Sequence, residues 1–214
     1  MSGLVKYDNS YYMRSEDTGE FTEVPRVTSV LSPGGIPDHI APYLLRGTRV
    51  HEWTEAEDAG ALTRSDRARI QGLEVEKYLE AWQAFKERYK WYSHMIEWSV
   101  VGTLDGFTYA GTADRYGKFP LAFDAVLDIK TTNAAKPGRS SQHGMQLAAY
   151  AHAIEQTLCR GMPDQGHLKA PKNLDRGVIV YLRGDGTYVL HHYDLDEFLP
   201  QFTEKLRKYY GEYW

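Results

Sequence analysis

The sequence predicts a mixed α/β (α+β) fold, with one central mixed β-sheet flanked by helices. Short runs rich in β-branched and aromatic residues, such as residues 123–131, indicate strands. Longer segments with a helical period of apolar residues, such as residues 65–90, lie between these runs. Turn sequences separate the strands, and Leu104-Asp105-Gly106 is typical of a hairpin. A chain of 214 residues, 42% hydrophobic, suits a single domain covering residues 1–214.

Composition excludes several classes of protein. A net charge of −4 gives no overall basic footprint, so any nucleic-acid contact must come from a local patch. The single cysteine, Cys159, excludes an intramolecular disulfide and a four-cysteine zinc or iron–sulfur site, and it favours a cytoplasmic setting. The start of the chain lacks the apolar core of a signal peptide, and no run is long enough to span a bilayer. We therefore expect no membrane partner.

The first half of the chain predicts a hairpin and two helices. An N-terminal hairpin covers about residues 5–31, with residues 11–14 and 21–24 on either side of Asp17-Thr18-Gly19-Glu20. Residues 27–31 follow Pro25 and end at a Pro-Gly-Gly loop. Asp38 is placed to cap a helix over about residues 39–59. A second helix runs from residue 65 or 66 to about 90, and the basic side chains on it fit a solvated face.

The second half predicts three strands, a helix, and a terminal hairpin with its own helix. The strands cover residues 95–101, 106–114 and 123–131, and the helix covers about 140–160. Residues 161–174 are a loop by composition. Residues 176–182 and 187–193 form a hairpin, after which Asp194 caps a helix over 195–210. This C-terminal unit, about residues 175–214, is expected to pack on the sheet or to form a subunit contact.

The core strand Val126-Leu127-Asp128-Ile129-Lys130-Thr131-Thr132 carries an acid and a base. Successive strand side chains alternate faces, so Asp128 and Lys130 point the same way. Such charges are costly in a buried strand unless they are paired, metal-bound or used. The preceding strand ends at Gly111-Thr112-Ala113-Asp114, and antiparallel pairing would bring Asp114 beside Asp128. The pattern predicts a hard-cation site with a lysine attached, or alternatively a buried ion-pair cluster.

Further polar residues could complete this site. Gln146 and Tyr150 share one face of the following helix. His51, after a glycine on the first long helix, is a candidate metal ligand, although taken alone it is typical of a structural histidine. Glu97 is equally compatible with a site acid and with a solvated one. Asp124 is an alternative acid or a residue at the strand entrance.

Taken in order, this set resembles the PD-(D/E)XK nuclease superfamily, and within it the RecB-like branch of RecB and AddB nuclease domains, CRISPR-adaptation nucleases and phage exonucleases. The resemblance covers roughly residues 27–152 and implies a restriction-endonuclease-like core. It implies that Asp114 and Asp128 bind Mg²⁺ or Mn²⁺, and that Lys130 acts on water and the phosphate. His51 would be an additional ligand, and Gln146 and Tyr150 would be catalytic or contact DNA. The single cysteine argues against the iron–sulfur cluster that some relatives carry.

The resemblance implies a divalent-metal-dependent DNase, an exonuclease rather than a site-specific endonuclease. Its setting would be recombination, repair or phage DNA metabolism in the cytoplasm of a bacterium or phage-infected cell. The expected partners are DNA ends and a recombination protein or helicase. The Ile129 carbonyl and Glu97 are further candidate metal ligands. Expected DNA contacts are Arg49, Arg115, Lys118, Lys136, Arg139 and residues 86–91.

Three alternatives remain open at this point. One is a catalytically idle nucleic-acid-binding scaffold of the same fold. Another is a structure-specific endonuclease, and the third is a metal-dependent hydrolase that acts on a substrate other than nucleic acid.

Overall fold

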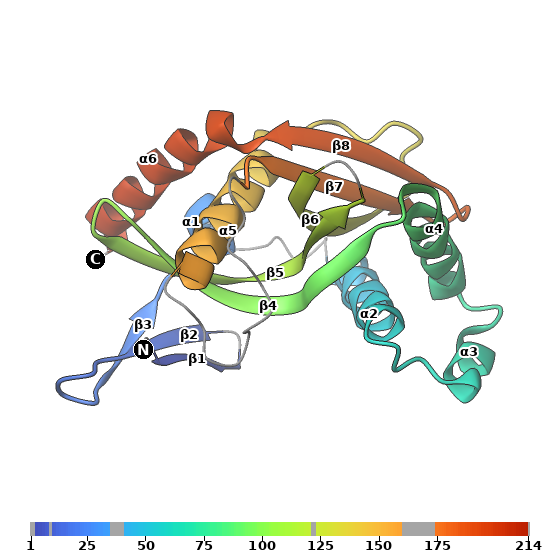
Figure 1. Cartoon of the computed structure of the whole chain (residues 1–214), viewed down its shortest axis with the longest axis horizontal. Helices are drawn as coiled ribbons and strands as arrows, with labels where there is room; N and C mark the ends of the chain where they lie inside the picture. The colour runs from blue at the N-terminus through green and yellow to red at the C-terminus, as the bar shows by residue number, and fades with distance from the viewer. Residues whose placement is uncertain (1–2, 9, 35–40, 121–122, 160–173, 214) are drawn as a thin grey trace.

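The computed structural model describes residues 3–8, 10–34, 41–120, 123–159 and 174–213. The strands in this part of the chain are β1 (Gly3–Tyr7), β2 (Ser10–Arg14), β3 (Phe21–Val24), β4 (Tyr92–Leu104), β5 (Phe107–Phe119), β6 (Phe123–Thr132), β7 (Arg176–Arg183) and β8 (Tyr188–Asp194). The helices are α1 (Val27–Leu31), α2 (Ala41–Asp58), α3 (Arg64–Ile70), α4 (Glu74–Tyr89), α5 (Ser141–Cys159) and α6 (Leu195–Tyr213). Figure 1 shows helices packed around a curved central sheet, so the predicted fold class is confirmed.

The central sheet is mixed, with strand order β4-β5-β6-β7-β8. Only the β6–β7 pair is parallel, while the β4–β5, β5–β6 and β7–β8 pairs are antiparallel. A parallel pair needs a long crossover, and α5 lies between β6 and β7 in the chain. The three central strands and the final hairpin therefore share one sheet, whereas the sequence predicted that the C-terminal unit packs on the sheet or forms a subunit contact.

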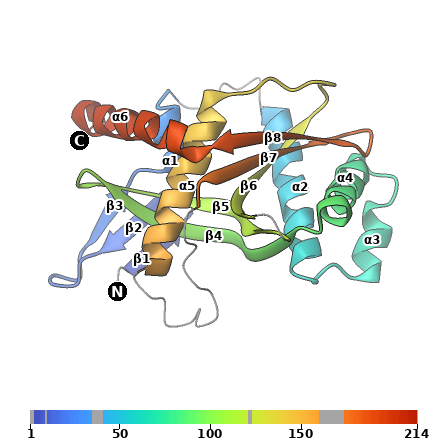
Figure 2. The ribbon, with the colours of Figure 1, turned by 45° about the horizontal axis from the view of Figure 1, so that its top comes forward.

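Helices cover both faces of this sheet, which is why residues 125–129 of β6 and 177–182 of β7 are buried without a break. Val126 and Ile179 pack in one core with residues of α1, α5 and α6. Leu127, Ile129 and Val180 pack in a second core with residues of α2 and α4. Figure 2 shows α5 and α6 at one end of the molecule and α2, α3 and α4 at the other. Because side chains alternate along β6, those of Asp128 and Lys130 lie on the same face as Val126, which is the face toward α5.

The N-terminal hairpin is confirmed, and the structure extends it. Strands β2 and β3 pair as predicted, and β1 adds a third antiparallel strand. This small sheet attaches to β5 through a bridge between Arg26 and Ala110 and through a 2.6 Å hydrogen bond between Tyr11 Oη and Thr112 Oγ1. The expectation that residues 27–31 belong to the hairpin is wrong, because they form the short helix α1 and bury Val27 in the main core.

The predicted helix over 65–90 is two helices. Gly72 adopts φ +78°, a backbone conformation that favours glycine and ends a helix, so α3 and α4 are separate. A capping box between Thr63 and Asp66 starts α3. The proposed cap Asp38 and the expected loop over 161–173 lie outside the described residues. Within the described part of the chain, no helix has the length and apolarity needed to cross a membrane.

Strands β5 and β6 form a fork. Their pairing runs from Phe119 opposite Phe123 to Arg115 opposite Leu127 and then stops. Beyond that point β5 continues beside β4 alone, while residues 128–132 of β6 pair with β7 alone. The two strands thus diverge just where Asp114 and Asp128 stand. The fork creates an opening in the sheet that side chains from both helical layers can reach.

Candidate active site

The peptide of Ile129 sits in the fork, and two side chains bind it there. Its N–H donates to Asp114 Oδ2 at 2.8 Å, and its carbonyl oxygen lies 2.9 Å from His51 Nε2. These contacts take the place of hydrogen bonds that a neighbouring strand would have made. Asp114 comes from β5 and His51 from α2, so the fork fixes both residues relative to the core strand.

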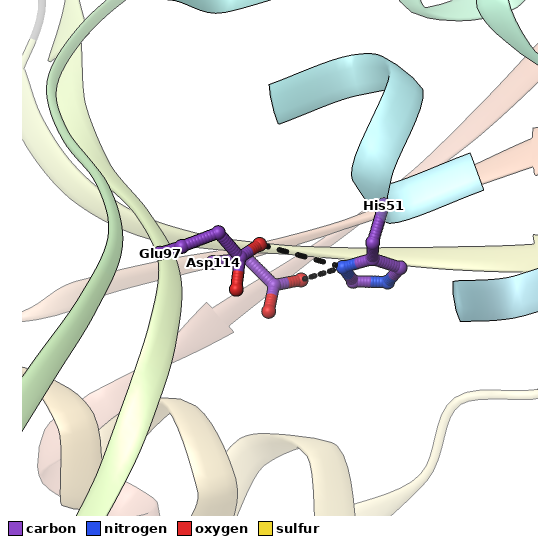
Figure 3. Close-up of side chains that lie close together, drawn as sticks. All are labelled: His51, Glu97 and Asp114. Atoms are coloured by element: carbon purple, nitrogen blue, oxygen red, sulfur yellow. Dashed lines mark ion pairs between the residues drawn. The ribbon is translucent and has the colours of Figure 1, made fainter. Parts of the chain in front are cut away.

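His51, Glu97 and Asp114 form a candidate cation cage. His51 Nδ1 lies 3.5 Å from Asp114 Oδ2 and 3.6 Å from Glu97 Oε1, and all three ligand atoms lie within 4.8 Å of one another. Figure 3 shows both carboxylates pointing at the imidazole. One nitrogen and two carboxylate oxygens are donors that divalent metals accept. Three elements supply the cage, since Glu97 comes from β4.

The Ile129 carbonyl orients His51. An imidazole that donates Nε2–H to a backbone carbonyl presents Nδ1 to the other side, which here is the side of the carboxylates. Burial acts to lower the pKa of His51, but Asp114, Glu97 and Asp128 outweigh it and raise the pKa to about 9. A proton on His51 therefore balances the acids, and a metal ion would replace it. In the structure this carbonyl binds His51, whereas the sequence predicted it as a metal ligand.

Glu97 has an unusual backbone. Its φ is +46°, in the left-handed region that residues with a side chain rarely adopt. Such a conformation costs about 1–3 kcal/mol and persists only where the surroundings hold it. Of the two roles that the sequence left open for Glu97, its geometry favours a site acid over a solvated one.

Asp128, Lys130, Gln146 and Tyr150 form a second group on the α5 side of the fork. Asp128 is buried, and its two carboxylate oxygens lie 3.0 and 2.7 Å from Lys130 Nζ. Gln146 Nε2 donates to Asp128 Oδ1 at 3.1 Å and to Tyr150 Oη at 3.4 Å. Burial raises the pKa of Tyr150, so its phenol stays neutral. All four residues predicted for this side are brought together.

The Asp128–Lys130 pair leaves one carboxylate oxygen without a well-aligned hydrogen bond. Oδ2 is within 2.7 Å of Lys130 Nζ, yet the angles do not make this contact a hydrogen bond. Burial raises the pKa of Asp128, and Lys130 only partly opposes it. Burial also acts to lower the pKa of Lys130, but Asp128 and Asp114 outweigh it and raise the pKa. A buried acid with an unsatisfied oxygen fits a cation site, since a metal ion would take that lone pair.

The site opens onto a cleft of about 510 Å³ between α2 and the end of β6. Glu97, Ile129, Lys130 and Thr131 line it from the sheet side. Residues of α2 line the other wall, and these are Leu44, Gly47, Thr48, His51, Glu52 and Glu55. His51, Glu97 and Lys130 thus line a space that is open to a substrate.

The candidate DNA contacts fall into two groups. Arg49, Lys136 and Arg139 are exposed, and the Arg139 guanidinium stacks over Tyr193 at 4.6 Å. Arg115 was predicted as a DNA contact, but it is fully buried and bound to Asp58 at 2.7 Å, so it does not face a substrate. Lys86 also binds Asp58, at 2.7 Å, so this member of the 86–91 segment is already paired.

Two more expected residues lie away from the fork. Lys118 is exposed and lies opposite Asp124, in the part of β5 and β6 where the two strands are paired. Asp124 lies 4.0 Å from His94 and is a strand-entrance residue.

Sequence reasoning missed a basic hollow on the other side of Tyr150. It measures about 190 Å³, and its lining includes Lys6, Arg26, Thr28 and Thr112. Among the described residues, neither Lys6 nor Arg26 forms an ion pair; Lys6 Nζ donates to Thr112 Oγ1 at 3.2 Å. No local pattern signals this hollow, because its residues come from β1, α1's first turn and β5.

Comparison with known proteins supports the fold. No family model matches the chain, and no curated protein matches it. Among solved structures, that of SSO0001 matches at 17% identity, over 86% of this chain and 82% of that one, with a TM-score of 0.38. A candidate exonuclease from Eubacterium rectale matches at 14% identity over 76% of this chain, with a TM-score of 0.50. The matched region spans 65% of that protein's length. The likeness to the Eubacterium rectale protein shows that the two chains have a similar fold.

Proposed function

We propose that the protein is a divalent-metal-dependent DNase of the PD-(D/E)XK type that hydrolyses phosphodiester bonds from DNA ends. The observation that carries this proposal is the convergence of two groups on one peptide. His51 and Asp114 bind the backbone of Ile129, while the flanking residues, the buried Asp128 and the partly exposed Lys130, form an acid–base pair beside it. The arrangement opens onto a cleft, which a purely structural ion-pair cluster does not require.

Each residue has a role that follows from its position. His51, Glu97 and Asp114 would hold Mg²⁺ or Mn²⁺, with Asp128 able to join through its unsatisfied oxygen. When bound, such an ion neutralises charge on the scissile phosphate and makes a water more acidic. Lys130 lines the cleft, and its ammonium would stabilise charge on the phosphate and orient water. Gln146 fixes the rotamer of Asp128, and Tyr150 supports Gln146.

The proposed substrate is DNA, held by cations at the rim. Glu52 and Glu55 make the cleft wall acidic, so the backbone phosphates would be bound by exposed groups around it. Arg49, Lys136 and Arg139 are suitable, as are Lys6 and Arg26 in the hollow behind Tyr150. The preference for ends has its support in the fold likeness to a candidate exonuclease. A recombination protein or helicase in the bacterial or phage-infected cytoplasm remains part of the proposal.

The test is metal-dependent loss of DNA. End-labelled single- and double-stranded linear DNA and a closed circular single strand are incubated with Mg²⁺, Mn²⁺ or EDTA. Wild type is compared with Asp128→Ala, Lys130→Ala and a matched control, Asp124→Asn, which changes another acid of the same strand. We expect linear DNA to be degraded by wild type and control in the presence of metal, and by neither Asp128→Ala nor Lys130→Ala.

The other outcomes separate the alternatives. A circle that is cut as fast as linear DNA makes the protein an endonuclease. Binding of DNA with a steep salt dependence, but without cleavage under any metal, supports the idle scaffold. Neither binding nor cleavage, together with metal binding, points to a hydrolase of another substrate.

A further inference from the structure

Arg115 is connected to every residue of the candidate cation cage, either directly or through Thr54. Arg115 directly follows Asp114 in β5, and none of its surface is exposed. A buried guanidinium is costly unless each of its N–H groups finds a partner. The hydrogen-bond partners of Arg115 therefore indicate which groups it positions.

Three of those partners belong to or lead to the cage. Nη1 donates to the backbone carbonyl of Asp114 at 2.7 Å and to Glu97 Oε1 at 3.3 Å. Nη2 donates to Thr54 Oγ1 at 3.3 Å. That hydroxyl in turn donates to the carbonyl oxygen of His51 at 3.0 Å, so one guanidinium connects the backbone or side chain of every cage residue.

The opposite side of Arg115 is anchored to α4 and to the end of α2. Its Nε donates to Asp58 Oδ2 at 2.7 Å. Asp58 Oδ1 accepts from Trp82 Nε1 at 3.0 Å and from Lys86 Nζ at 2.7 Å. The guanidinium also lies 5.7 Å from the centre of the buried Trp82 ring. Because these partners are themselves buried and paired, Arg115 has a fixed position from which to hold the cage.

Glu97 is the residue that needs this support most. Its Oε1 is shared between Arg115 Nη1 and His51 Nδ1, and its backbone is left-handed. A strained backbone relaxes unless contacts oppose it. The positive charge of Arg115 also offsets repulsion between the Glu97 and Asp114 carboxylates before any cation is bound.

We propose that Arg115 is the positioning residue that pre-organises His51, Glu97 and Asp114 for a divalent cation. This inference rests on the cation site of the proposed function. The role requires an arginine rather than a lysine. The planar guanidinium donates to Asp58, Glu97, Thr54 and the Asp114 carbonyl at the same time, whereas the compact ammonium of a lysine lacks donors spread over such a plane. Groups behind metal ligands typically change metal affinity by about 10–100-fold when they are altered.

The experiment measures Mn²⁺ binding directly, without turnover. Mn²⁺ is titrated into the full chain, and the free ion is followed by electron paramagnetic resonance while unfolding is followed by circular dichroism. Arg115→Lys is compared with Lys86→Met, a matched control that breaks the other ion pair of Asp58 but touches no cage residue. Thr54→Val is a third variant that keeps the side-chain shape and removes the hydroxyl that joins Arg115 Nη2 to the His51 carbonyl oxygen.

We expect Arg115→Lys to weaken Mn²⁺ binding by about 10-fold or more, and Thr54→Val by about 3-fold or more. Lys86→Met should stay within about 2-fold of wild type even though it lowers the melting temperature. If Arg115→Lys does not fold, Thr54→Val against Lys86→Met decides the question in the same way.

Two results would overturn the inference while the metal site stands. One is equal Mn²⁺ affinity of Arg115→Lys (or, where that variant is unfolded, of Thr54→Val) and wild type. The other is an equal loss in Lys86→Met, which would make the effect a general consequence of the Asp58 network. If wild type itself binds no Mn²⁺, the cation site of the proposed function fails, and the role of Arg115 fails with it.

Discussion

Helix α5 contributes to two polar clusters of similar residue types, and only one of them resembles an active site. Toward the fork it presents Gln146 and Tyr150, which meet Asp128. One to two turns later it presents His152 and Gln156, which meet Tyr109 and the backbone of Thr103. A glutamine, a tyrosine and a histidine thus occur in both surroundings, since His51 stands on the far side of the fork.

The polar groups of the second cluster form hydrogen bonds with one another and with nearby backbone. Tyr109 Oη lies 3.0 Å from the Ala149 carbonyl oxygen and 2.8 Å from His152 Nδ1. Gln156 accepts the N–H of Thr103 and donates to its carbonyl, both at 3.0 Å. In the fork, by contrast, three acids lie beside His51, Lys130 and Arg115, Asp128 Oδ2 lacks a well-aligned hydrogen bond, and a cleft gives access to His51, Glu97 and Lys130. The difference shows that charged groups gathered beside an open cleft distinguish the candidate site from a cluster that contains the same glutamine, tyrosine and histidine.

The sharpest test of this comparison removes one group from each cluster. Asp114→Asn should lower metal-dependent DNA cleavage by about 10³-fold, because an amide is a poor ligand for a hard cation. Tyr109→Phe should leave cleavage within about 2-fold while it costs about 1–3 kcal/mol of stability, since buried partners lose their hydrogen bonds. Cleavage rates and urea unfolding give both quantities. A Tyr109→Phe enzyme as inactive as Asp114→Asn would erase the distinction.

Substitution of two glycines by alanine tests the same comparison, because the added methyl group would crowd the tyrosine of one cluster or of the other. A Cβ on Gly111 would stand 2.6 Å from Tyr150 Cε1, and one on Gly102 would stand 2.5 Å from Tyr109 Oη. Both alanine variants should lose about 1–3 kcal/mol of stability through overpacking. Only Gly111→Ala should also slow cleavage, by about 10–100-fold, because it displaces Tyr150 and through it Gln146. Equal activity of the two variants would show that the position of Tyr150 does not matter for catalysis.

Substitution of the two glutamines by alanine should have smaller effects, one on cleavage activity and the other on stability. Gln146→Ala should reduce cleavage by about 10-fold with little change in unfolding, because Asp128 keeps Lys130 but loses one orienting donor. Gln156→Ala should do the reverse, costing about 1–3 kcal/mol, since Thr103 loses partners for both its N–H and its carbonyl. Rates at saturating metal, beside thermal unfolding, check both expectations. Loss of activity in Gln156→Ala alone would contradict them.

The last comparison concerns stability in the presence of metal. Mn²⁺ at about 100 times its dissociation constant should stabilise the folded protein by about 2.7 kcal/mol, since the unfolded chain lacks the cage. Thermal unfolding with Mn²⁺ or EDTA measures this shift. Tyr109→Phe should retain the shift in full, and Asp114→Asn should lose most of it. A full shift in Asp114→Asn would place the bound ion elsewhere.

The sequence predicted the site residues better than it predicted their grouping. The order His51, Glu97, Asp114, Asp128, Lys130, Gln146 and Tyr150 led to residues that the structure brings to one fork. The assignment of Arg115 to DNA failed, because a cationic side chain looks the same in sequence whether it faces solvent or Asp58. The break at Gly72 was missed because the apolar period of residues 65–90 continues across it.

By itself, the sequence determined the central strands, the long helices and the shared strand face of Asp128 and Lys130, because these depend on periods of two and 3.6 residues along a short stretch of chain. Only the tertiary structure decided that β5 and β6 diverge after Arg115 and Leu127, and that His51 approaches the exposed peptide from α2. Only the tertiary structure showed that Glu97 has a left-handed backbone and that the Arg115 guanidinium donates to its carboxylate. Those features arise from contacts between residues far apart in the chain, whose free energies no local pattern encodes.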